Sequence, residues 1–186
     1  MSKSILTVVM LLQVIPGHVL AQTSSGEAHV ELSGSFGWGG LSRFGDSTPF
    51  GSGLSVGGRL GVRPLDRLGL GFEVHGMTGM KENVKSAMVF SGIATFDLST
   101  SDRARPYVLG GIGMMRTNNR ATTYVVRQSV TNFTDVGSGL VMGLGARVFL
   151  TPQVSLRPEL TYINALWNST ENLSETRASM AVGYQW

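Results

Sequence analysis

Histidine and carboxylate side chains are the groups of this chain that could carry acid–base chemistry, because an imidazole beside a carboxylate can accept and return a proton. His75 stands two residues after Glu73, and in an extended strand this spacing places both side chains on one face. A serine nucleophile would need such a histidine within hydrogen-bonding reach. Glu73 and His75 are therefore the best candidates for catalysis. We nevertheless expect His75, like His29, to be an interior polar residue and predict no catalytic site.

The sequence predicts neither a metal site nor a cofactor site. Cysteine is absent, which excludes thiolate ligands and disulfides, and His29 and His75 do not form a ligand motif. Segments 57–61 and 110–113 are rich in glycine, as phosphate-binding loops are, but they lie inside predicted strands with no helix after them. Close packing of neighbouring strands explains these glycines better.

The elements that must position these residues are strands. At the end of the sequence Ala178, Met180, Val182, Tyr184 and Trp186 alternate with small or polar residues, which indicates a strand with one apolar face. Seven further runs show the same period of two, and turn residues separate them. One run is glycine-rich and ambiguous in its phase. The predicted strands are 28–38, 54–63, 68–75, 88–98, 106–115 (the ambiguous run), 140–148, 154–162 and 177–186.

Composition indicates which face of these strands points outward. Only 15% of the residues are charged, whereas the surface of a soluble domain is usually about 25–35% charged. A soluble, lipocalin-like barrel is therefore disfavoured. The apolar face fits lipid, and the face of small and charged residues fits a narrow lumen in which each charge needs an opposite partner.

We therefore predict an all-β fold, an eight-stranded antiparallel up-and-down transmembrane β-barrel. Arginines and glutamates on the polar faces are expected to pair inside it. This predicted lumen charge network consists of Glu31, Arg59, Arg63, Glu73, Arg147, Arg157, Glu159 and Arg177.

The N-terminal residues predict export. Lys3 precedes an apolar run over residues 5–15, which is shorter than the about 20 residues of a membrane-spanning helix. Pro16 and Gly17 then break the helix, and small residues lead to a cleavage site after Ala21. We expect residues 1–21 to be a signal peptide and residues 22–186 to form one outer-membrane β-barrel domain.

The lengths of the connections predict an orientation. Short connections at 64–67, 99–105 and 151–153 alternate with long ones at 37–52, 77–86, 117–136 and 164–175. Outer-membrane barrels have short periplasmic turns and longer extracellular loops, so both termini are expected in the periplasm. Aromatic residues near the predicted strand ends are expected at the membrane interfaces. They are Phe36, Trp38, Tyr107, Phe149, Tyr162, Tyr184 and Trp186.

Three segments carry a resemblance to a known family. Residues 105–113 (RPYVLGGIG), 144–160 (LGARVFLTPQVSLRPEL) and 182–186 (VGYQW) resemble the small outer-membrane β-barrels of bacteria, of the outer-membrane-protein-A-like and opacity types. The resemblance covers the chain after the predicted signal peptide, and it concerns fold and assembly rather than activity. It implies that the barrel assembly machinery recognises the last strand through Val182, Tyr184 and Trp186.

The predicted function is that of a non-enzymatic integral outer-membrane protein whose surface loops serve envelope structure, adhesion or recognition. One alternative is a lipid A-modifying enzyme of the deacylase or acyltransferase type, although no His-x-Ser pair followed by Glu is present. A small-solute channel is less favoured, because side chains fill an eight-stranded interior.

The expected partners are outer-membrane lipid and lipopolysaccharide, the barrel assembly machinery during biogenesis, and an unknown extracellular ligand of the loops. The formal net charge is only +3, and the basic residues are scattered. The sequence therefore does not predict nucleic-acid binding.

Overall fold

The computed structural model describes residues 28–43, 49–78, 84–120, 132–167 and 173–186. Within these ranges no helix is long and apolar enough to cross a membrane. The predicted signal peptide at 1–21 lies outside the described residues. The strands are β1 (His29–Arg43), β2 (Pro49–Arg63), β3 (Leu68–Thr78), β4 (Val84–Asp97), β5 (Ala104–Arg120), β6 (Asn132–Phe149), β7 (Val154–Trp167) and β8 (Leu173–Gln185).

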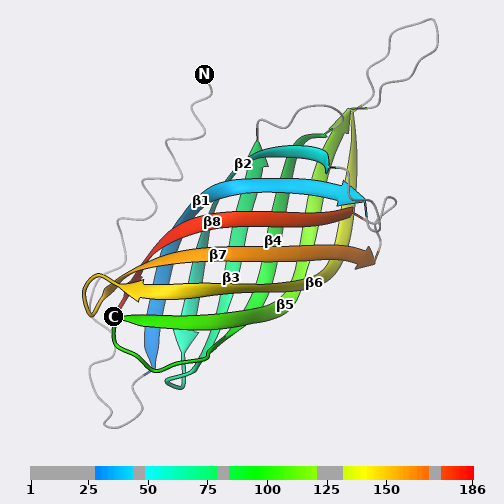
Figure 1. Cartoon of the computed structure of the whole chain (residues 1–186). Coiled ribbons are helices and arrows are strands. Elements are labelled where there is room, and N and C mark those ends of the chain that lie inside the picture. The colour runs from blue at the N-terminus through cyan, green and yellow to red at the C-terminus, as the bar shows by residue number, and fades with distance from the viewer. Residues whose placement is uncertain (1–27, 44–48, 79–83, 121–131, 168–172) are drawn as a thin grey trace, which may run out of the picture.

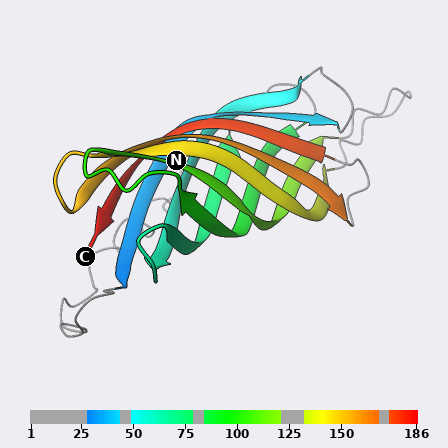
Figure 2. The same cartoon turned by 60° about the horizontal axis from the view of Figure 1, so that its bottom comes forward.

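The strands form one closed barrel in which each strand is antiparallel to both of its neighbours (Figure 1, Figure 2). Pairing of β8 with β1 closes the sheet, and the backbones of Val30 and Trp186 exchange two hydrogen bonds of 3.1 Å at its edge. Closure leaves no unpaired strand edge, which is what a spanning sheet requires in hydrocarbon. The predicted eight-stranded antiparallel barrel is confirmed.

One end of the barrel carries both β1's first residue and the C-terminal Trp186, together with the connections 64–67, 98–103 and 150–153. We call it the turn end and the opposite end the loop end. At the turn end the predicted short connections are present. At the loop end the predicted long connections are partly strand: β1 continues to Arg43 and β2 begins at Pro49, inside the predicted loop 37–52.

The same correction applies to the other three loops, because their first and last residues belong to strands. Apolar alternation ends where the lipid-facing band ends, and the sequence prediction used that alternation. Backbone pairing does not depend on it: Arg120 still lies opposite Asn132, and Asn164 opposite Ser174. Polar residues can continue an antiparallel ladder beyond the apolar band.

Side chains alternate between the lumen and the outer wall. Outward positions include large apolar residues with high exposure, such as Phe36 at 61% and Ile112 at 68%. In β5 the phase that the sequence left open is now clear, because Tyr107 and Leu109 are buried in the lumen while Val108 points outward. This strand has apolar side chains on both faces, and alternation therefore could not reveal its phase.

Pro158 lies inside β7, opposite Met180 of β8. On the other side, the ladder with β6 pairs Gly145 with Glu159 and Val148 with Leu156 but no residue between them. Proline cannot donate a ladder hydrogen bond, and the sheet accommodates it by this local break without a change of register.

Candidate functional site

Charged side chains fill one side of the lumen and run along the barrel axis. The alternation of β1, β2, β3, β7 and β8 turns every second residue inward, and β4 and β6 add one charged residue each near the turn end. We call this set the charged column. It comprises Glu31, Arg59, Arg63, Glu73, His75, Asp97, Arg147, Arg157, Glu159, Glu175 and Arg177, all at most 8% exposed.

All eight residues of the predicted charge network therefore face the lumen. Asp97 and Glu175 are further members that the sequence prediction missed. Asp97 stands at an inward position of a predicted strand, so its phase could have indicated it. Glu175 was assigned to a loop, because the apolar alternation of β8 begins only after it.

At the turn end the column is built on Asp97. Its carboxylate accepts hydrogen bonds from Arg63 at 2.7 Å and from Arg147 at 2.9 Å. Arg147 also lies 3.3 Å from Glu31, which forms a second ion pair with Arg157. Each carboxylate here serves two guanidinium groups, so the buried charges compensate one another.

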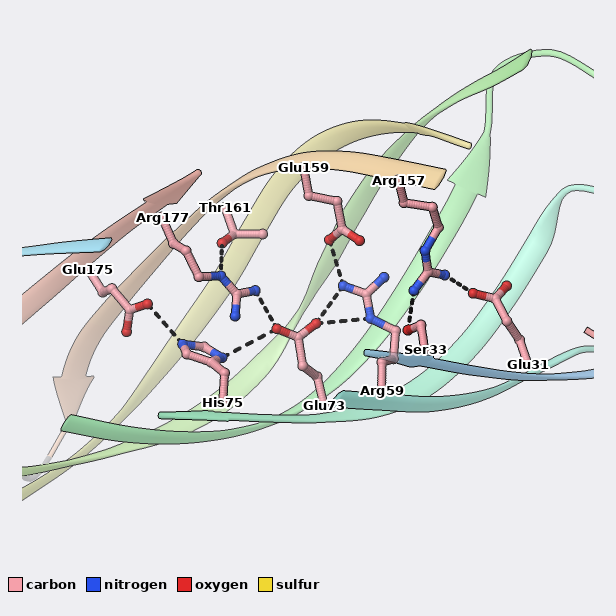
Figure 3. A network of polar contacts seen from close by, with 10 residues as sticks. All are labelled: Glu31, Ser33, Arg59, Glu73, His75, Arg157, Glu159, Thr161, Glu175 and Arg177. Atoms are coloured by element: carbon pink, nitrogen blue, oxygen red, sulfur yellow. Dashed lines mark hydrogen bonds and ion pairs between the residues drawn. The ribbon is translucent and has the colours of Figure 1, made fainter. Parts of the chain in front are cut away.

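In the middle of the column Arg59 lies between two carboxylates. One terminal nitrogen of its guanidinium is 2.5 Å from Glu73 and 2.6 Å from Glu159 (Figure 3). Arg177 also forms an ion pair with Glu73 and donates a 3.2 Å hydrogen bond to Thr161. Glu73 of β3 thus contacts more basic side chains than the other carboxylates of the column do. They are Arg59 of β2, Arg177 of β8 and His75 of its own strand.

His75 ends the column toward the loop end. Its Nε2 is 2.8 Å from Glu175 Oε1, and its Nδ1 is 3.3 Å from Glu73 Oε1. Carboxylate oxygens accept hydrogen bonds, so this setting suits an imidazole with a proton on each nitrogen. The His75 ring is 1% exposed and points away from the outer wall, where a lipid substrate would be. The geometry is that of an interior ion pair.

A second part of the lumen is apolar. It covers the β4–β6 wall and, toward the loop end, also includes residues of β1, β3, β7 and β8; we call it the apolar plug. Its members are Leu41, Met77, Val84, Ala87, Val89, Ile93, Tyr107, Leu109, Met115, Val141, Ile163, Ala165 and Leu173. The prediction of a lumen lined only by small and charged residues is therefore wrong for this part.

Tyr107 is a specific correction, since it was expected at a membrane interface. It is 1% exposed inside the lumen, with the Arg147 guanidinium 5.3 Å from its ring centroid. Phe149 is half-buried at the turn end, under the Arg105 guanidinium at 5.2 Å. Tyr184 and Trp186 remain on the outer wall, half exposed, with ring centroids 5.8 Å apart.

The column and the plug leave little free space. Two cavities beside the column, lined in part by Arg59 and Arg157, have volumes of about 20 and 10 Å³, which is room for about one water each. Among the described residues no group of histidine and carboxylate side chains is placed to hold a metal ion.

The comparisons with known proteins agree with this architecture. The family model of the outer membrane protein β-barrel domain matches residues 6–185. The chain belongs to this family. Membership places the barrel in the bacterial outer membrane, with its apolar outer wall facing lipid.

Solved structures with the same fold are distant in sequence. Neisserial surface protein A has a TM-score of 0.67 at 16% identity, covering 89% of this chain and 100% of that one. The N-terminal barrel of OprF from Pseudomonas aeruginosa has 0.60 at 18%, covering 85% and 97%. Ail of Yersinia pestis, solved with the heparin analogue sucrose octasulfate, has 0.59 at 13%, covering 86% and 99%. No curated protein sequence matches. At these sequence identities the similarities show a shared fold and nothing about function.

Proposed function

We propose that this outer-membrane barrel is a non-enzymatic scaffold that displays recognition surfaces outside the cell, with both termini in the periplasm. The observation that carries the proposal is the contrast between a sealed lumen and an extended loop end. Ion pairs and the apolar plug fill the interior, which argues against passage of solutes. Binding is therefore assigned to the strands and loops beyond the membrane.

The β5–β6 hairpin is the strongest candidate for such a surface. Its strands have 17 and 18 residues, whereas about 9–11 residues cross a bilayer. Since the strands pair up to Arg120 and Asn132, the excess forms a paired ribbon beyond the apolar band, and β4 flanks this ribbon as far as Asn119 (Figure 1, upper right).

The chemistry of this end favours an anionic ligand. Arg116 and Arg120 belong to the ribbon, and Lys85 of β4 lies across from its base, near Asn119. Arg116 and Lys85 are exposed. Lipopolysaccharide phosphates and sulfated host saccharides both carry the charge that arginine and lysine bind. The complex of Ail with a heparin analogue supports the idea that a barrel of this fold can hold a polyanion.

A lipid A-modifying enzyme is the alternative outcome. The His75–Glu73 pair would have to reach a lipid, and its burial inside the sealed lumen disfavours this. Mass spectrometry of lipid A from cells that express the protein distinguishes the two functions. Unchanged lipid A masses are expected. A mass shift that His75→Ala abolishes would replace the scaffold proposal by the enzymatic one.

The recognition proposal is tested by replacing Arg116 and Arg120 of the ribbon with serine, which removes the two cations and leaves the strand pairing in place. The variant should fold and keep its heat-modifiable gel migration but lose retention on immobilised heparin and lipopolysaccharide. A matched control replaces the exposed turn-end cations Arg67 and Arg103 with serine and should retain binding. Equal retention by both variants would contradict the assignment to the ribbon.

Orientation is testable because the chain lacks cysteine. A Gln128→Cys variant should react with an impermeant maleimide on intact cells, whereas Ser101→Cys in a turn-end connection should react only after lysis. The reverse pattern would place the termini outside.

We also propose that the assembly machinery reads the outward residues of β8. Val182, Tyr184 and Trp186 lie in one outward row at 52%, 50% and 48% exposure. Deleting Trp186 should strongly lower outer-membrane levels, whereas Phe133→Ala in the ribbon should leave them nearly unchanged. Quantitative blots of outer-membrane fractions measure both. Equal levels would refute the terminal signal.

A further inference from the structure

The outer wall carries an apolar groove near the turn end. It has a volume of about 570 Å³ and crosses the sheet from β7 to β3. Gly34 of β1 and Gly58 of β2 lie directly opposite each other in its floor. Val182 flanks the floor on the β8 side and Val74 on the β3 side. Leu32, Leu60, Phe72, Val154 and Tyr184 also line the groove.

Packing within the barrel does not require glycine at the two floor positions. A Cβ atom on Gly34 would meet nothing within 4 Å, and one on Gly58 only the Ser33 carbonyl oxygen at 3.4 Å. By contrast, a Cβ on the inward-facing Gly37 would collide with the backbone of Ser179, at 2.6 Å. Glycine weakens a strand interior and often marks the close approach of another molecule. Gly92 and Gly110 are equally open but do not line the groove, whereas Gly34 and Gly58 lie side by side in its floor, where a molecule from outside can approach the backbone.

The position of the groove on the outer wall indicates which kind of molecule approaches the two glycines. It is continuous with the lipid-facing wall, and its outward-pointing side chains are apolar, whereas Ser33 and Arg59 contribute to the lining from inward-facing positions. A hydrocarbon chain is therefore compatible with the groove along its length. At the turn end it reaches Tyr184, whose ring stands 5.8 Å from that of Trp186. Such aromatic rings favour the headgroup region. A lipid with its headgroup at these rings would direct a chain onto the glycine floor.

A second copy of the barrel fits less well. A two-fold axis through this face would place the groove against itself, and two concave floors would enclose a void rather than pack. We propose that the groove is a binding site for one acyl chain of a membrane phospholipid, which lies over Gly34 and Gly58 with its headgroup near Tyr184 and Trp186.

The test fills the floor with a side chain. Gly34→Leu occupies open space and should not strain the sheet. Gly92→Leu is the matched control, because Gly92 also points outward with nothing within 4 Å of its Cβ but does not line the groove. Each barrel is refolded in mild detergent with dipalmitoyl phosphatidylethanolamine, and native mass spectrometry counts the retained lipids.

The unmodified protein and Gly92→Leu should each retain one phospholipid, and Gly34→Leu should lose at least tenfold in occupancy. Equal occupancy in all three proteins would overturn the proposal. So would a dimer that Gly34→Leu dissociates while lipid retention is unchanged, because the groove would then be an interface between copies.

A second measurement leaves the groove intact, in case Gly34→Leu does not fold. Trp38→Phe and Trp167→Phe together leave Trp186 as the sole tryptophan. A phospholipid brominated on its acyl chain is mixed with its unbrominated parent in vesicles, and fluorescence of Trp186 is followed. A bound chain should quench Trp186 beyond the level that random lipid contact gives to a tryptophan in the variant Val148→Trp with Trp186→Phe, because Val148 points outward at the same end of the barrel but does not line the groove. Equal quenching at the two positions would overturn the proposal.

Discussion

The two parts of the lumen solve the same packing problem by different means. In the charged column, each buried guanidinium needs a carboxylate at hydrogen-bonding distance, and one carboxylate often serves two arginines. In the apolar plug, the same volume is filled by side chains whose only requirement is shape. The column is therefore sensitive to charge, and the plug is sensitive to volume.

Their positions differ as well as their chemistry. The column begins at Arg63 and Asp97 near the turn end and stops at His75 and Glu175, where the plug takes over. Gly39 shows how closely the plug is packed, because the sulfur of Met77 occupies the space that a Cβ at this position would need. Together the two parts fill most of the lumen that the described strands enclose.

The largest effect is expected from Glu73→Ala. This change leaves Arg177 without its ion pair and removes one carboxylate from both Arg59 and His75. Breaking a buried pair costs about 3–5 kcal/mol, so the free energy of unfolding should fall by about 4 kcal/mol. Urea unfolding in lipid vesicles, followed by tryptophan fluorescence, measures this.

Glu159→Ala should cost less, about 3 kcal/mol, because Arg59 keeps Glu73. Asp102→Ala is the control: its carboxylate is fully exposed and 3.6 Å from Arg105, and no measurable change is expected. If all three variants unfolded at the same urea concentration, the column would not stabilise the barrel.

The sequence predicted the column better than the plug, for a physical reason. A charged residue in the polar phase of a membrane strand has few acceptable positions, so Glu31, Arg59 and Glu159 indicated the lumen directly. An apolar residue fits either lipid or a packed interior. The apolar character of Leu109 and Val141 therefore did not indicate whether they face lipid or the lumen. Tyr107 was expected at the membrane interface, although it packs under Arg147 in the lumen.

The barrel itself was predictable because alternation, turn residues and low charge agreed over eight runs. The ends of the strands at the loop end were not, since backbone pairing there continues through polar residues. Pairings such as Arg59 with both Glu73 and Glu159 depend on the stagger of strands far apart in sequence. Alternation within each strand carries no information on that stagger.

Substitutions that nearly conserve side-chain shape should affect the stability of the two parts of the lumen differently. Met77→Ala should cost about 3 kcal/mol through the cavity that it leaves, whereas Met77→Leu, which nearly conserves volume, should cost less than about 1.5 kcal/mol. Glu73→Gln also conserves shape, yet it should retain most of the loss of Glu73→Ala because it removes the charge. The same urea titrations give all three values. Similar losses for Met77→Leu and Glu73→Gln would show that shape, not charge, governs both parts.

Smaller effects than those of the charge variants should come from adding one methyl group on each side of the lumen. Gly111 lies between Ile93 and Val141 of the plug, and a Cβ there would meet the Gly92 carbonyl oxygen and lie 2.9 Å from Ile93 Cα. Both are backbone atoms that cannot move freely, so Gly111→Ala should cost about 2 kcal/mol by overpacking. Gly71 instead lines the 20 Å³ cavity beside the column, and its Cβ would have the Leu60 carbonyl oxygen at 3.0 Å and the flexible Arg59 side chain at 3.6 Å. Gly71→Ala should therefore cost less than about 1 kcal/mol.

Gly110 is the control, because it is the outward neighbour of Gly111 and has nothing within 4 Å of its Cβ. Its replacement by alanine should cause no loss of stability. A loss for Gly71→Ala as large as that for Gly111→Ala would mean that the column is packed as tightly as the plug.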